Sequence, residues 1–162
     1  MDAPILRVIA QRHPADCSVA CLAMLLGVSY ENALVAIAPD EPNVCVMGAY
    51  EPSIKRAAVR LGYRLRVKKR VDLESDTGIL TVRSRKWKTT HLVVLKNGLI
   101  VDTDACVYDA DVFLATQRAT VGSLLVAEAV RERTDTRNGR RAVPEVRRRE
   151  RRTQGLRLAG GG

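Results

Sequence analysis

The periodicity of the apolar residues changes at Gly62, and this change most restricts how the chain can fold. Before Gly62 the apolar side chains recur at helical spacing. After it, apolar and basic residues alternate from Tyr63 to Lys68, which indicates a half-buried strand. Helical segments followed by strands, rather than interleaved with them, are typical of an α+β domain with an antiparallel sheet.

Capping and stop residues delimit the expected helices. Asp16 can cap the first turn of an apolar helix, and Gly27 supplies the left-handed residue with which many helices end. Ser29 is placed to cap the next helix, which Pro39 terminates. The expected helices cover residues 17–26, 30–38, 52–61 and 109–117.

The strands are bounded by turn signals, of which Asn97-Gly98 is the strongest. This dipeptide between two apolar runs predicts a two-residue hairpin turn. The expected strands cover residues 63–68, 78–82, 91–95, 99–101 and 122–130.

Charge divides the chain into a domain, residues 1–130, and a tail, residues 131–162. The tail holds eleven arginines and four carboxylates, so it carries +7 of the net charge of +9. It has few apolar residues to offset the entropy of ordering, and we expect it to be disordered. The tail could contact nucleic acid or an acidic partner, and it ends in Gly-Gly-Gly.

No membrane segment or cofactor motif is evident. The longest nearly apolar run, residues 17–28, is far shorter than the ~20 residues that cross a bilayer, and the N-terminus does not resemble a secretory signal. We therefore expect a cytoplasmic protein with reduced cysteines. His13, Cys17 and Cys21 recur at a spacing of four, but Pro14 places His13 before the helix, so we expect no metal and no cofactor.

Cys17 is the candidate nucleophile because it opens the first helix. The positive end of a helix dipole favours a thiolate, and a neighbouring imidazolium adds to that effect. His91, at the start of a strand, could supply the imidazolium. The backbone amide of Cys17 and the side-chain amide of Gln11 could then stabilise an oxyanion.

A histidine base needs a group that fixes its orientation. Residues of like parity in a hairpin face the same side, so His91, Asp102 and Asp104 are predicted to share a face. A two-residue turn would pair His91 with Asp104 and place Asp102 on the diagonal, and either carboxylate is within reach. Trp87, in the basic loop before His91, either packs beneath that loop or forms a wall of a substrate cleft.

Three segments carry a resemblance to a known family. The run from Gln11 through Asp16-Cys17-Ser-Val-Ala-Cys-Leu-Ala-Met-Leu, together with His91-Leu-Val-Val-Leu and Ile100-Val-Asp102, resembles the bacteriocin-processing (double-glycine) peptidases, which are papain-like cysteine peptidases. The resemblance extends over about residues 5–130 and implies a papain-like fold with N-terminal helices on an antiparallel sheet. It also implies a peptide or protein substrate.

By this resemblance, Cys17 is the nucleophile, His91 the general base and acid, Asp102 the orienting residue and Gln11 the oxyanion donor. The family usually has glycine after the nucleophile and proline after the aspartate, whereas this chain has Ser18 and Thr103. Since no membrane or nucleotide-binding segment is evident, we expect a free-standing domain.

Three functions are consistent with these features. The first is a cysteine peptidase. By the resemblance above, its cleavage site would follow a Gly-Gly pair, and the Gly-Gly-Gly end of the tail is either such a substrate or a linker. The second is a papain-like binding module without turnover, and the third is a nucleic-acid-associated protein that acts through its basic tail. The set of Gln11, Cys17, His91 and Asp102 favours the peptidase.

Overall fold

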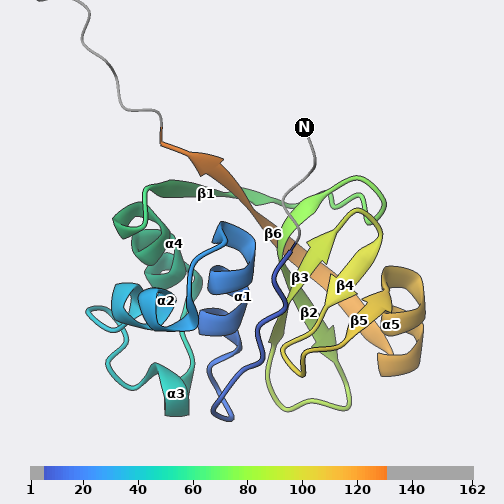
Figure 1. Cartoon of the computed structure of the whole chain (residues 1–162). Coiled ribbons are helices and arrows are strands. Elements are labelled where there is room, and N and C mark those ends of the chain that lie inside the picture. Colours follow the sequence, from blue (N-terminus) through green and yellow to red (C-terminus); the bar gives the residue numbers. More distant parts are fainter. Residues whose placement is uncertain (1–5, 131–162) are drawn as a thin grey trace, which may run out of the picture. The chain divides into compact units, whose positions relative to one another are not determined.

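The computed structural model describes residues 6–130 of the chain, and the predicted tail lies outside the described residues. Within this part, four helices precede a sheet, and one more helix lies before the last strand (Figure 1). The elements are α1 (Cys17–Leu26), α2 (Tyr30–Ile37), α3 (Val44–Met47), α4 (Glu51–Arg60), β1 (Tyr63–Lys68), β2 (Thr77–Ser84), β3 (His91–Lys96), β4 (Leu99–Val101), β5 (Val107–Asp109), α5 (Ala110–Gln117) and β6 (Ala119–Ala129).

The described strands form one sheet of six, in the order β1-β6-β2-β3-β4-β5, and every neighbouring pair is antiparallel. β6 is last in sequence but lies between β1 and β2, and Figure 1 shows it crossing the sheet as its longest strand. β2 and β6 approach closely at Gly78, where a Cβ atom would lie 2.4 Å from the carbonyl oxygen of Leu125. A side chain at position 78 would therefore separate the two strands.

The predicted hairpin at Asn97-Gly98 is confirmed. Lys96 pairs with Leu99, and both turn residues have positive φ angles, +46° for Asn97 and +83° for Gly98. Such angles match the primed two-residue turns that join twisted strands, and asparagine and glycine tolerate them best.

The two faces of the sheet bury different clusters. Alternate strand residues point to opposite faces, so Ile79 and Val94 pack with α1, α2 and α4, whereas Leu80 and Val93 pack with α5. Figure 1 shows α1, α2 and α4 together on one side of the sheet and α5 on the other. The larger cluster therefore lies under the helices that precede the sheet.

The predicted mixture of helices and antiparallel sheet is confirmed, with differences in detail. Ser29 caps α2 by accepting a hydrogen bond from the amide of Asn32, and Gly27 ends α1 at φ +67°. The sequence did not predict α3, which interrupts the expected loop before α4, or β5. No single helix among the described residues is long and apolar enough to cross a bilayer; α1 and α2 reach that composition only as a pair bent by 118°.

Candidate active site

The N-terminus of α1 presents Cys17 at the surface of an otherwise buried helix. Eight of the ten residues of α1 are buried, but Cys17 is only half-buried. The first amides of a helix have no partner within it, so they form a region of positive potential around the sulfur. α1 also packs against β3, whose first residue is His91.

Asp16 holds the loop that precedes Cys17. We predicted that its side chain caps α1, and this is wrong: the carboxylate makes no capping hydrogen bond to the helix. Instead Oδ2 accepts hydrogen bonds from the backbone amides of Arg12, at 3.2 Å, and His13, at 3.1 Å, and from the Tyr30 hydroxyl. Asp16 is fully buried, and these bonds fold residues 11–16 back over the start of the helix. Burial, and then the contact with Asp16, raises the pKa of Tyr30.

His91 is linked to both the sheet and the helix. Its Nε2 lies 2.7 Å from Asp102 Oδ1, and the Cys17 side chain lies near enough to the ring to raise its pKa as well. Since Nε2 faces Asp102, Nδ1 is the nitrogen left for Cys17. Burial alone would lower the pKa of His91, but the hydrogen bonds and charges of Asp102 and Cys17 outweigh burial and raise the pKa to about 9.

Asp102, rather than Asp104, contacts His91. The chain leaves the ladder after Val101, and a turn in which the Asp102 amide donates to the carbonyl of Cys106 follows. Asp104 therefore does not reach the position opposite His91. Its carboxylate accepts hydrogen bonds from the Cys106 amide and the Tyr108 hydroxyl, each at 2.9 Å.

Hydrogen bonds also stabilise the ionised form of Asp102. Burial would raise the pKa of its carboxyl group, but the hydrogen bond and charge of His91 and the hydrogen bond from the Thr103 backbone amide keep the pKa below its usual value. The side chains of His91 and Asp102 are 24% and 16% exposed, so water screens this pair only weakly. His91 and Asp102 thus form a charged pair at neutral pH.

Gln11 is connected to Asp102 by hydrogen bonds through Thr103. The Gln11 backbone amide donates to the Thr103 carbonyl at 2.8 Å, and the Thr103 hydroxyl donates to Gln11 Oε1 at 2.6 Å. Gln11 Nε2 donates to the His13 carbonyl at 3.0 Å and lies 3.5 Å from that of Pro14. The structure therefore brings the region of Gln11, the Cys17–His91 pair and Asp102 into one connected group. The interpretation from sequence missed the part of Thr103, whose only signal was its departure from the family pattern.

Trp87 packs against the histidine. The ring centroids of Trp87 and His91 are 5.4 Å apart, and the rings meet edge to face at 62°. The indole is half-buried and also packs against the cluster that contains Leu80 and Val93. Trp87 therefore lies beside the candidate base.

The other thiols are in different surroundings. Cys21, one helical turn from Cys17, is fully buried, and burial raises the pKa of its thiol. Cys45 is half-buried and Cys106 is exposed, and all four cysteines are free. Of the four, Cys17 alone combines partial exposure, the start of a helix of more than two turns and a histidine partner.

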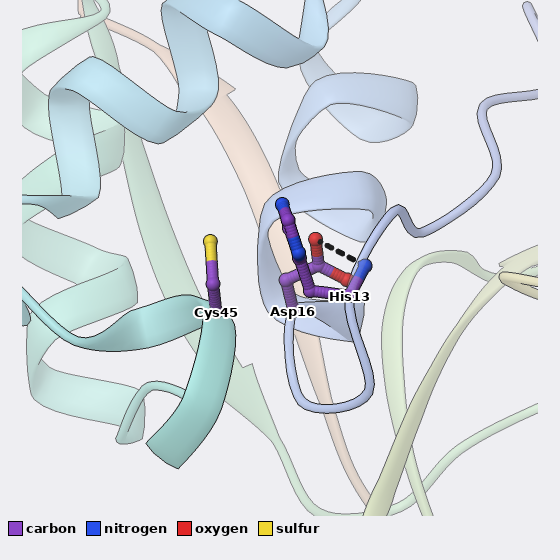
Figure 2. A group of neighbouring side chains, drawn as sticks. All are labelled: His13, Asp16 and Cys45. Atoms are coloured by element: carbon purple, nitrogen blue, oxygen red, sulfur yellow. Dashed lines mark hydrogen bonds between the residues drawn. The ribbon is translucent and has the colours of Figure 1, made fainter.

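His13, Asp16 and Cys45 are the one group within residues 6–130 whose donor atoms lie close enough for a metal ion. One ligand atom from each lies within 4.8 Å of the others (Figure 2). This is not the set whose spacing we considered from sequence. Asp16 Oδ2 already accepts three hydrogen bonds, whereas buried Oδ1 has none, so an ion here would have to bind Oδ1 or displace the Tyr30 hydroxyl.

Comparison with known proteins supports the fold. Neither a family model nor a curated protein matches the chain. Among solved structures, it is similar to a double-glycine motif protease from an AMS/PCAT transporter, crystallised in complex with the leader peptide. The TM-score is 0.56 at 20% identity, over 77% of this chain and 92% of that one. The chain has the fold of a double-glycine motif protease. The resemblance found in the sequence is thus confirmed for the fold.

Proposed function

We propose that the chain is a cysteine peptidase in which Cys17, His91, Asp102 and Gln11 carry out peptide-bond cleavage. The observation that carries this proposal is the 2.7 Å contact of His91 Nε2 with the Asp102 carboxylate, on a ring whose pKa the nearby Cys17 side chain at the start of α1 also raises. A charged imidazole beside a sulfur at a helix N-terminus favours the thiolate, which is the nucleophilic form of cysteine.

The first step is attack of the Cys17 thiolate on the carbonyl carbon of the substrate. The π electrons of the carbonyl move to its oxygen, and the backbone amide of Cys17 and one N–H of Gln11 Nε2 stabilise the resulting oxyanion. The C–N bond then breaks, and the His91 imidazolium gives its proton to the departing amine. An acyl thioester on Cys17 and a neutral His91 remain.

The second step is hydrolysis of that thioester. His91, now neutral, takes a proton from water as the hydroxide attacks the acyl carbon. The C–S bond breaks, the acid product leaves, and the thiolate–imidazolium pair is restored. Throughout, Asp102 keeps Nε2 occupied, so Nδ1 faces the reacting atoms.

The proposed substrate is a peptide cleaved after a glycine pair. The similar solved protease is a double-glycine motif protease bound to a leader peptide, and this supports an extended peptide for the present chain. Glycine, which has no Cβ, is the residue best able to pass a narrow opening beside the sulfur.

Labelling and turnover together test the proposal. A peptide electrophile ending in Gly-Gly should modify the native chain once, at Cys17, as measured by intact mass and peptide mapping. The Cys17→Ala variant, which keeps three thiols, should remain unlabelled under the same conditions. A fluorogenic peptide with Gly-Gly before the scissile bond should be cleaved faster than its Ala-Ala counterpart.

Three results would contradict parts of the proposal. Labelling of Cys17 without turnover of any peptide would indicate a binding module that retains the fold. Equal labelling of Cys17 and Cys106 would show that Cys17 is not activated. Equal cleavage of the Gly-Gly and Ala-Ala peptides would remove the proposed specificity and leave the peptidase.

A further inference from the structure

Thr103 contacts both the candidate oxyanion donor and the candidate orienting carboxylate. Its hydroxyl lies 2.6 Å from Gln11 Oε1, and its backbone amide donates to Asp102 Oδ1 at 2.6 Å. Its carbonyl accepts the Gln11 backbone amide at 2.8 Å. Thr103 is 2% exposed, so water competes little for these bonds. Thr103 therefore links Gln11 to Asp102, through its own backbone groups and through its hydroxyl.

The chemistry of the partners fixes the direction of these bonds. Gln11 Nε2 faces the carbonyls of His13 and Pro14, which can only accept, so the nitrogen and the oxygen of this amide cannot be exchanged. Gln11 Oε1 must then face Thr103, whose hydroxyl has one proton to donate. The Asp102 carboxylate is the more distant acceptor for that proton, at 3.4 Å, so the proton goes to Gln11.

The contacts of Gln11 leave its Nε2 with spare capacity to donate. Nε2 has two hydrogens, and its acceptors are the His13 carbonyl at 3.0 Å and the Pro14 carbonyl at 3.5 Å. A hydrogen bond at 3.5 Å is weak, so Nε2 can also donate to an oxyanion. The hydroxyl of Thr103 holds the other end of the same amide and so limits its rotation.

We infer that Thr103 is a positioning residue, whose hydroxyl orients the Gln11 amide toward the oxyanion while its backbone amide holds Asp102. The inference rests on the proposed peptidase function. Because the two bonds come from different parts of Thr103, a side-chain substitution separates them: Thr103→Val removes the hydroxyl and keeps the backbone amide. The expected defect is therefore in oxyanion stabilisation and not in the charge state of His91.

The experiment compares Thr103→Val, Thr103→Ser, Gln11→Ala and the Gln11→Ala/Thr103→Val double variant with the native chain on a Gly-Gly peptide. Removal of one oxyanion donor lowers kcat on the order of 100-fold or more, so Gln11→Ala should fall in that range. Thr103→Val should lower kcat about 10-fold or more with KM changed less than twofold, and Thr103→Ser should recover most of the loss. The double variant should equal Gln11→Ala, because the hydroxyl acts only through that amide.

Alkylation by iodoacetamide is the second measurement. Displacement of iodide by sulfur forms no oxyanion, so Thr103→Val should alkylate Cys17 at the native rate with the native pH dependence. This result also shows that the variant is folded around the site.

Each outcome bears on the inference. Native kcat in Thr103→Val, a defect in Thr103→Ser as large as in Thr103→Val, or multiplied losses in the double variant would overturn it. Slow alkylation of Cys17 in Thr103→Val would indicate that the hydroxyl supports His91 rather than Gln11. Absence of turnover in the native chain would overturn the peptidase function itself and the inference with it.

Discussion

The helical segment and the sheet each contribute half of the candidate site, but they hold their residues in different ways. Gln11 and Cys17 are placed by backbone hydrogen bonds, by the buried carboxylate of Asp16 and by a helix whose remaining surface is almost entirely packed. His91 and Asp102 are held by the attraction between two charged side chains at the end of a hairpin. The position of the nucleophile thus depends on packing, whereas the state of the base depends on electrostatics. Substitution of Asp102 should therefore change the pH dependence of activity, and substitution of Gln11 should not.

The largest effect is expected from removing the base on the sheet side. His91→Ala should lower kcat/KM on the order of 1000-fold or more, within the range that general acid–base groups supply. The matched control is His13→Ala, since His13 is the other histidine of the chain and is exposed. Cleavage rates of a Gly-Gly peptide measure both. If His13→Ala lost as much activity as His91→Ala, the base could not be assigned to the sheet side alone.

A smaller loss is expected when the carboxylate is neutralised. Asp102→Asn keeps the shape but removes the charge that faces His91 Nε2, and should lower kcat on the order of 100-fold, at the lower end of what general acid–base groups supply. Asp104→Asn is the control, because Asp104 bonds Cys106 and Tyr108 instead. A silent Asp102→Asn beside a damaging Asp104→Asn would show that the orienting residue has been misassigned.

The pH dependence sharpens the comparison further. The pKa of His91 is raised to about 9, above its ordinary value of 6.5, so the imidazolium is present at neutral pH and is lost as pH rises through about 9. Activity should fall about tenfold per unit above pH 9. The stability that the His91–Asp102 pair contributes is fully present below pH 6.5 and should be lost as pH rises from 6.5 to 9. NMR titration of the His91 ring measures the pKa directly. In Asp102→Asn the pKa should be lower, and an unchanged value would contradict the electrostatic account.

The smallest effect is expected at Trp87. Burial is the influence that lowers the pKa of His91, and the indole packs against the ring. Trp87→Ala should therefore raise the pKa of His91 further, by less than one unit, with turnover reduced less than tenfold. Trp87→Phe, which keeps an aromatic ring, should lie between this variant and the native chain. A fall in the pKa of His91 in Trp87→Ala would show that the indole favours the imidazolium, as an aromatic face does a cation.

Local signals predicted the fold well where the interaction itself is local. The cap at Ser29 and the turn at Asn97-Gly98 each need only a few neighbouring residues, and both were confirmed. The insertion of β6 between β1 and β2 has no such signal, because it depends on pairing between residues 35 to 66 positions apart in the chain. The short helix α3 was missed because four residues carry too little periodicity.

The same contrast between local and long-range interactions applies to the candidate site. Residue types and chain order predicted which side chains belong to it, but the strand register of the hairpin could not decide between Asp102 and Asp104. Extending the hairpin ladder assumed that the strand continues, whereas the chain turns away after Val101, with Ala105 at φ +67°. The redirected carboxylate of Asp16 and the bridging part of Thr103 follow from tertiary contacts that no local pattern encodes.

The place of β6 in the sheet has a consequence for biosynthesis. β1 pairs only with β6, so it has no partner in the sheet until residues 119–129 have left the ribosome. The hairpins of β2, β3, β4 and β5 need no later segment, and they can form while the chain is still growing. The base and its carboxylate can thus meet early, whereas the sheet that supports α1 and its thiol is completed last. A nascent chain released before β6 would expose the edges of β1 and β2, which are prone to aggregate.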